Sequence, residues 1–197
     1  MRKCKAVVVL LHEIYGLNDH MKHYEKWLRQ QGFEVVIPSL IPSVFSYKEE
    51  KVAYESFMNE IGFQSASKHA REVIEECSRT FERVYVVGFS IGATIAWMCS
   101  PMPEVKRTVC FYGSRIRDYG EIRPQSPTLL LYGESEPSFP VEEFIRHIKI
   151  EHVTALSVAG SHGFADPFSK RFHKPSYEVA LSLLSNHLHL KQKAGQH

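Results

Sequence analysis

Short apolar runs alternate with amphipathic helical segments along almost the whole chain, and this alternation is the strongest constraint on its fold. The first run, 6–11, is rich in valine, too short for a helix and typical of a strand that is covered on both faces. Strands that alternate with helices form parallel sheets joined by right-handed crossovers. The pattern therefore predicts an α/β fold with a mostly parallel sheet and helices on both of its faces.

Six strands and five helical regions follow from this pattern. The expected strands are 6–11, 33–37, 83–87, 105–111, 128–132 and 153–158. The expected helices are 19–31, about 48–81 in two pieces broken near Gly62, 91–100, 141–150 and about 176–190. The segment 113–127 has no convincing helical pattern and is expected to be a long loop. Its arginines, Arg115, Arg117 and Arg123, are either solvated or functional.

Length and composition indicate one domain spanning residues 1–197. A chain of 197 residues is within the usual single-domain range of roughly 100–200 residues. Hydrophobic residues make up 44% and charged residues 23% of the chain, as is ordinary for a soluble globular protein and too apolar for a disordered one. The formal net charge is only +2, so the overall charge does not indicate a nucleic-acid partner.

The expected compartment is the cytoplasm. The first apolar run has six residues, too few for a signal-peptide core, and no stretch approaches the ~18 apolar residues of a membrane span. Four cysteines lack a CxxC or Cys/His ligand pattern and are expected to be reduced thiols: Cys4, Cys77, Cys99 and Cys110.

One motif points to chemistry. Residues 88–92 read Gly-Phe-Ser-Ile-Gly and lie between an expected strand and an expected helix, which is the context that a G-x-S-x-G nucleophile elbow requires. The two glycines are needed because side chains beside the sharp turn at Ser90 would collide with their surroundings. Such a turn places the hydroxyl above the sheet edge and at a helix N-terminus, where the Ile91 amide can face an oxyanion.

A serine hydroxyl needs a base, and the base needs an orienting carboxylate. In folds with this elbow the chain order is serine, acid, histidine. His162 directly follows the sixth strand, at the carboxyl edge of the sheet where such folds hold their sites. His12 also ends a strand, but it precedes the serine and is expected either to have a structural role or to support the residues of the site.

The acid should follow the fifth strand, where the sequence offers two carboxylates, Glu134 and Glu136. Asp166 is a weaker candidate because it shares the loop of His162. The residue pattern alone leaves the choice between the two glutamates open.

Three segments together resemble the dienelactone hydrolase family of α/β-hydrolases. They are VVLLHEIYGLN at 8–18, GFSIG at 88–92 and SHGFAD at 161–166. The resemblance covers most of the chain and implies a compact α/β-hydrolase fold with no separate cap domain. It gives Ser90 the nucleophile position, His162 the base position and Glu136 the acid position of the family's G-x-x-D segment.

The same resemblance assigns roles to the loop after the first strand. The Ile14 amide matches the group that joins the Ile91 amide in the oxyanion hole. Glu13 matches a family glutamate that sits beside the nucleophile and takes part in its activation. In this chain Glu13 is expected either to anchor the loop that carries Ile14 or to contact the Ser90 hydroxyl. In both cases a buried carboxylate should have a hydrogen-bonding partner nearby.

The chain also departs from the family pattern at three positions. Dienelactone hydrolases carry cysteine where this chain has Ser90, which is similar to esterase-type relatives. Glu136 replaces the usual aspartate and is one methylene longer. Asp166 stands where the family has a substrate-binding arginine, so the resemblance does not imply dienelactone itself as the substrate.

The expected function is a serine hydrolase that cleaves a small carboxylic ester or lactone through an acyl-serine intermediate, without a cofactor or metal. The alternative from another class is a catalytically silent α/β-hydrolase that binds a ligand or partner, but such proteins usually lose the serine or the histidine. Acyl transfer or peptide cleavage by the same three groups is a further possibility. No nucleic-acid or membrane partner is expected. The sequence leaves the physiological substrate and the oligomeric state open.

Overall fold

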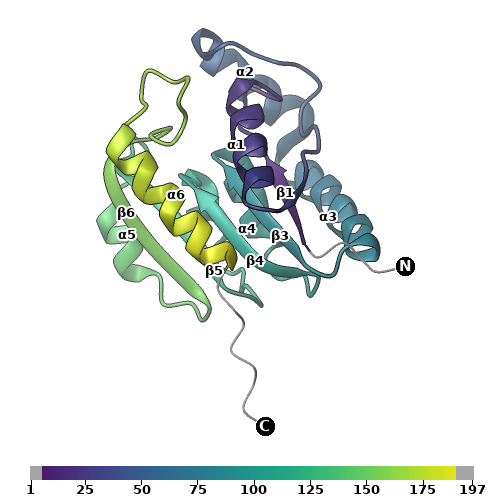
Figure 1. Ribbon diagram of the computed structural model, residues 1–197. Coiled ribbons are helices and arrows are strands. Elements are labelled where there is room, and N and C mark those ends of the chain that lie inside the picture. Colours follow the sequence, from purple (N-terminus) through teal and green to yellow (C-terminus); the bar gives the residue numbers. More distant parts are fainter. Residues whose placement is uncertain (1–5, 190–197) are drawn as a thin grey trace.

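A six-stranded parallel sheet forms the centre of the computed structural model, which describes residues 6–189 (Figure 1). The strands are β1 (Val7–Leu11), β2 (Glu34–Val36), β3 (Val84–Phe89), β4 (Val105–Phe111), β5 (Thr128–Ser135) and β6 (Val153–Ser161). They lie in the order β2-β1-β3-β4-β5-β6, and every neighbouring pair is parallel. The predicted α/β fold with about six parallel strands is confirmed.

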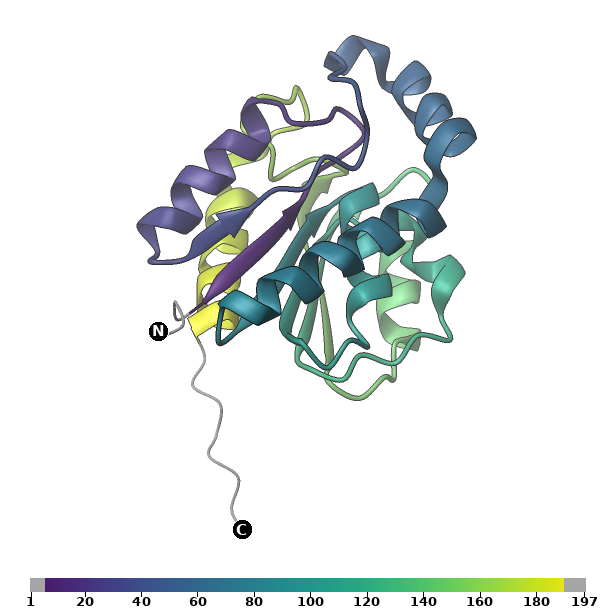
Figure 2. The same ribbon diagram turned by 90° about the vertical axis from the view of Figure 1, so that its right-hand side faces the viewer.

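Helices cover both faces of the sheet, as Figure 2 shows. One face packs against α1 (Asp19–Gln30) and α6 (Lys174–His189), and the other against α3 (Gly62–Thr80), α4 (Ile91–Cys99) and α5 (Val141–His147). All five residues of β1 have zero exposure, and they alternate between the two cores. This double burial explains the uninterrupted apolar run at the start of the chain.

The helical region before β3 is broken where the sequence predicts. A 3₁₀ turn at Tyr47–Glu49 leads into α2 (Glu50–Ser56), and a π-helical turn at Phe57–Ile61 connects α2 to α3. Gly62 takes a φ of 70°, a left-handed conformation that favours glycine, so the chain changes direction there. In Figure 2, α2 stands beyond the carboxyl end of the sheet.

The segment between β4 and β5 is not the irregular loop that the sequence predicts, because Ser114–Tyr119 forms a 3₁₀ helix. Ile116 is its one buried residue, which is too few for a recognisable periodicity. Arg115 donates to the Tyr54 hydroxyl at 2.8 Å, and Arg117 lies over the Phe139 ring. Arg123 is exposed, and its guanidinium donates to the Gly120 and Ile122 carbonyls of the same segment, so of the three arginines it comes nearest to the expectation of a solvated side chain.

Strand β5 extends three residues beyond its predicted end at Tyr132, because its pairing with β6 continues past a register shift near Gly133. Glu134 therefore lies on the strand and is exposed, whereas Glu136 directly follows the strand and is buried. The two candidate acids thus occupy different environments although only one residue separates them.

The cysteines within the described part of the chain match the prediction. Cys77, Cys99 and Cys110 are buried free thiols, and Cys4 lies outside the described residues. No helix within residues 6–189 is both long enough and apolar enough to cross a membrane.

The turn between β3 and α4 brings two backbones into very close approach. Ser90 has a φ of 52°, which strains a non-glycine residue by about 1–3 kcal/mol. A Cβ atom on Gly88 would lie 2.1 Å from the Gly92 carbonyl oxygen, and one on Gly92 would lie 2.3 Å from the Leu11 carbonyl oxygen. Both neighbours are backbone atoms that cannot move aside, so the glycines are required, as the sequence motif predicts.

Gly92→Ala should lower the free energy of unfolding by about 3 kcal/mol or more, at or beyond the upper end of ordinary overpacking, because backbone must shift. Gly120→Ala is the matched control, since Gly120 has a φ of −67° and a Cβ added there would have no atom within 4 Å. The control should leave stability unchanged or raise it by up to about 1 kcal/mol. Urea unfolding of the three proteins measures both effects, and equal stabilities would contradict the packing argument.

Candidate active site

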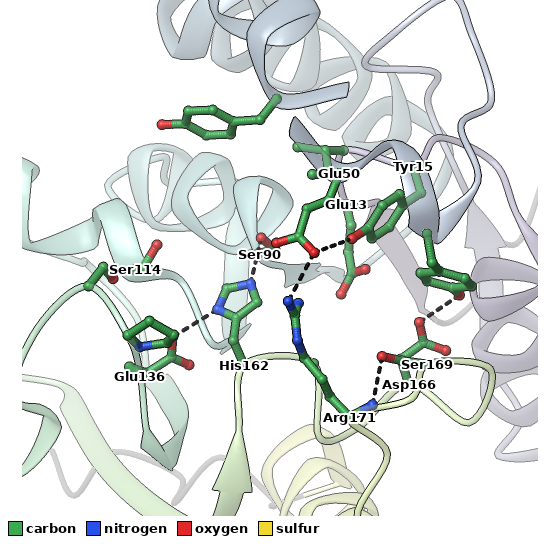
Figure 3. Close-up of a pocket in the computed structure, with 16 residues that line it drawn as sticks. Glu13, Tyr15, Glu50, Ser90, Ser114, Glu136, His162, Asp166, Ser169 and Arg171 are labelled. Atoms are coloured by element: carbon green, nitrogen blue, oxygen red, sulfur yellow. Dashed lines mark hydrogen bonds and ion pairs between the residues drawn. The ribbon is translucent and has the colours of Figure 1, made fainter. Parts of the chain in front are cut away.

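Three side chains from three strand ends meet in one pocket (Figure 3). Ser90 follows β3, Glu136 follows β5 and His162 follows β6. The Ser90 Oγ lies 3.0 Å from His162 Nε2, and His162 Nδ1 lies 2.8 Å from Glu136 Oε2. In the neutral imidazole, Nδ1–H donates to the carboxylate and Nε2 is left as an acceptor for the serine hydroxyl. This arrangement can remove a proton from Ser90.

The other two candidate acids do not reach the histidine. Glu134 is exposed on β5 and has no contact with His162 within the described chain. Asp166 is buried, but its carboxylate accepts from the Tyr47 hydroxyl at 2.6 Å and from the Phe168 amide at 2.9 Å. Of the three carboxylates considered from the sequence, only Glu136 bonds to the imidazole.

The environment of His162 makes it a stronger base than an ordinary histidine. Burial by itself lowers the pKa of the imidazole, but the hydrogen bond and charge of Glu136 raise it, and the charge of Glu13 adds to this. The net pKa is raised above its usual value of 6.5. A more basic imidazole suits a nucleophile as weakly acidic as a serine hydroxyl.

Two backbone amides beside Ser90 are free to donate. Ile91 is the first residue of α4, and Ile14 lines the pocket in the turn after β1. Neither amide donates a hydrogen bond to any group within residues 6–189. Unpaired amides at a helix N-terminus and in an adjoining turn are suited to holding a developing negative charge.

His12 fixes the peptide that carries the Ile14 amide. Its Nδ1 lies 2.6 Å from the Glu13 carbonyl oxygen, and its Nε2 accepts from the Leu40 amide at 2.8 Å. The Glu13 carbonyl and the Ile14 N–H belong to the same peptide group, so the ring also sets the direction of that N–H. The structural role predicted for His12 is confirmed.

The contacts of the Glu13 side chain match neither of the two roles expected from the sequence. Its carboxylate forms no hydrogen bond with Ser90 or with the loop backbone, and Oε1 has no hydrogen-bonding partner within the described chain. Burial first, and the nearby charge of Asp166 second, raise the pKa of Glu13 to about 7, although the adjacent Tyr112 phenol acts in the opposite direction. The loop is held by His12 instead.

Glu13 belongs to a cluster that the sequence does not reveal. Glu13, His20 and Asp166 each offer one ligand atom, and these atoms lie within 4.8 Å of one another. Of the described residues, these three form the group that could hold a metal ion.

Tyr112 is a site residue that the sequence reasoning missed. It directly follows β4 and has a φ of 43°. Its ring centroid lies 4.9 Å from that of His162, so the phenol ring limits how the imidazole can turn. Its place immediately after a strand of the sheet is the signal that could have identified it, because Ser90, Glu136 and His162 also directly follow strands.

The pocket is small, and its lining includes an arginine side chain that is paired with a glutamate. Its volume is about 230 Å³, below the ≈ 300–1,000 Å³ of typical ligand pockets. Arg171 lines it and forms an ion pair with Glu50 at 3.0 Å, and the Tyr15 hydroxyl also donates to Glu50 (Figure 3). The positive charge of Arg171 is thus largely compensated within the protein.

The sequence is similar to a known family and to a bacterial relative. The model of the dienelactone hydrolase family matches residues 2–188. The chain is 40% identical over 187 residues to YczH, an uncharacterized protein of Bacillus subtilis strain 168, and the match covers 92% of each chain.

Solved structures show the same fold. A Klebsiella pneumoniae protein assigned to the dienelactone hydrolases superposes with a TM-score of 0.79 and 17% identity, covering 97% of this chain and 89% of the other. The dienelactone hydrolase-like promiscuous phosphotriesterase P91 from metagenomic libraries gives a TM-score of 0.69 and 18% identity, covering 94% and 86%.

The contact between His162 and Glu136 predicts a titration that can be measured without any substrate. In the unaltered chain the NMR signal of the His162 ring should titrate above pH 6.5. Glu136→Gln should move this pKa downward, below 6.5, because burial then outweighs the remaining favourable charge. Glu134→Gln should leave it unchanged, since Glu134 is exposed and makes no contact with the ring. An equal shift in both variants would contradict the assignment of the partner.

Proposed function

Because this chain belongs to the dienelactone hydrolase family, we propose that it is a serine hydrolase that cleaves a carboxylic ester or lactone through an acyl-serine intermediate. The observation that carries the proposal is the pair of hydrogen bonds that links Ser90 through His162 to Glu136. A nucleophile, a base and an orienting acid in this order are what acyl transfer to serine requires.

The first half of the reaction forms the acyl-serine. His162 Nε2 takes the hydroxyl proton as Ser90 Oγ attacks the carbonyl carbon of the substrate. The carbonyl oxygen becomes an oxyanion, which accepts hydrogen bonds from the Ile14 and Ile91 amides. When the tetrahedral intermediate collapses, the bond to the leaving oxygen breaks and the imidazolium returns its proton to that oxygen.

The second half releases the acid. His162 removes a proton from a water molecule, and the resulting hydroxide attacks the acyl carbon. The same two amides hold the second oxyanion until the bond to Ser90 Oγ breaks and the hydroxyl is reprotonated by His162. Throughout the cycle Glu136 accepts from Nδ1–H, which keeps the ring oriented and stabilises the imidazolium when it forms.

The pocket favours small substrates without a carboxylate. A volume of about 230 Å³ suits a short acyl group or a small lactone better than a long acyl chain. Arg171 is already paired with Glu50, so its charge is largely compensated before a substrate binds. A substrate carboxylate would therefore gain little from this cation. We place this activity in the cytoplasm, in keeping with the three buried free thiols.

Ser90→Ala and His162→Ala should each lower kcat by a factor on the order of 10⁶, and the double variant should lose little more, because groups that act as a unit are not additive. A panel of p-nitrophenyl esters and small lactones measures the losses. Nearly additive effects, or substantial activity in Ser90→Ala, would refute the acyl-serine mechanism. Labelling by a fluorophosphonate probe distinguishes it from the silent binding module, which should not react at Ser90.

Glu136→Gln should lower kcat by a factor of roughly 10⁴, comparable to loss of the acid in another serine triad. The rate should rise with pH as His162 loses its proton, because only the neutral imidazole accepts the serine proton. Since Glu136 raises the pKa of His162, the acid limb of kcat/KM should move to lower pH in Glu136→Gln. Glu134→Gln should change neither quantity, and a larger effect there than at Glu136 would reassign the acid.

A further inference from the structure

Three buried ionisable side chains converge beside the pocket from three separate segments. Glu13 comes from the turn after β1, His20 from the first turn of α1 and Asp166 from the loop after β6. Their exposures are 5%, 0% and 1%. His20 Nδ1 lies 3.9 Å from Glu13 Oε1 and 3.8 Å from Asp166 Oδ2, so both carboxylates approach the same nitrogen.

The cluster is not satisfied by the protein itself. Glu13 Oε1 and both ring nitrogens of His20 have no hydrogen-bonding partner within the described chain. The His20 ring packs edge-on against Tyr24 and Phe89, with centroids 5.1 and 4.6 Å away. Burying unpaired polar groups in such surroundings costs free energy, and two neighbouring carboxylates add repulsion. A bound cation would pair with these atoms and offset the repulsion.

We propose that Glu13, His20 and Asp166 bind one divalent transition-metal cation through Oε1, Nδ1 and Oδ2. Two carboxylates and a neutral imidazole carry two negative charges, which a divalent cation neutralises. A donor set of one imidazole nitrogen and two carboxylate oxygens suits Zn²⁺, Co²⁺ or Mn²⁺. The proposal does not depend on the serine mechanism, in which none of these three side chains contacts the reacting atoms; Glu13 acts on it only through its charge near His162.

The spacing of the three atoms fits a cation. Two ligand atoms that each lie about 2.0–2.2 Å from one metal ion are at most about 4.4 Å apart, and the two nitrogen–oxygen separations of 3.9 and 3.8 Å fall within this limit.

Surrounding groups hold the ligands in place. The Tyr47 hydroxyl donates to Asp166 Oδ2 at 2.6 Å, and the Phe168 amide donates to the other oxygen. Asn18 donates to the Tyr47 hydroxyl and also caps α1, the helix that carries His20. Such outer hydrogen bonds orient the ligands of protein metal sites. Glu13 and Asp166 also line the pocket, so a cation can reach them from solvent.

Metal binding can be measured directly on the full, untagged chain after treatment with a chelator. Equilibrium dialysis with Zn²⁺ should give one bound ion per chain, and Co²⁺ should give a visible absorption band with the same stoichiometry. His20→Gln should weaken binding at least tenfold. His69→Gln is the matched control, because His69 lies 4.0 Å from Glu72 in an exposed pair outside the cluster, and it should bind as the unaltered chain does.

A thermal readout tests the same site independently of activity. Zn²⁺ at about 100 times its Kd should raise Tm by roughly 5–10 °C in the unaltered chain and in His69→Gln, but not in His20→Gln. If His20→Gln does not fold, Glu13→Gln and Asp166→Asn replace it. Absence of a stoichiometric ion in the unaltered chain would overturn the proposal and leave a cluster that shares protons only. Equal binding by the ligand variants and the unaltered chain would overturn it as well, because the ion would then lie elsewhere.

Discussion

The close approach of the first turn of α4 to the end of β1 is the constraint on which the rest of the site depends. Gly92 has no side chain, so its Cα lies directly against the carbonyl groups of Leu11 and His12. This contact brings the turn at Ser90 beside the turn that carries the Ile14 amide. The Ser90 amide donates to the Phe111 carbonyl of the next strand at 2.9 Å, which helps to hold the strained residue in place. One backbone contact thus places Ser90 beside both amides.

The last four strands of the chain, β3 to β6, place side chains in the site by a simple rule. Each of β3, β4, β5 and β6 is followed immediately by a residue of the site, namely Ser90, Tyr112, Glu136 and His162. Parallel neighbours end at the same edge of the sheet, so residues far apart in sequence meet there without long connecting loops. Since these residues are set by strand ends rather than by flexible segments, the hydrogen bonds between them need little ordering.

Much of this could be predicted from the sequence because the signals are local. Strands, helices and the elbow depend on short patterns of apolar residues and glycines, and the sheet follows from their alternation. The predicted group of Ser90, Glu136 and His162 is brought together because strand ends fix where such residues lie. The 3₁₀ helix at Ser114–Tyr119 could not be predicted, because a single buried residue gives no recognisable hydrophobic periodicity. The surroundings of Glu13 could not be predicted either, because His20, Tyr112 and Asp166 come close to it only through tertiary packing.

His12 and His162 end two strands of the same sheet, yet their environments drive their protonation in opposite directions. Burial lowers the pKa of His12 to about 4, whereas Glu136 holds that of His162 above 6.5. Above about pH 4 the His12 ring is neutral and keeps its contact with the Glu13 carbonyl, whereas His162 changes its charge only near its own, higher pKa. The contact that orients the Ile14 amide therefore does not change over the pH range in which His162 titrates. The two histidines thus differ in role: His12 supports the backbone at constant charge, whereas His162 can gain and lose a proton.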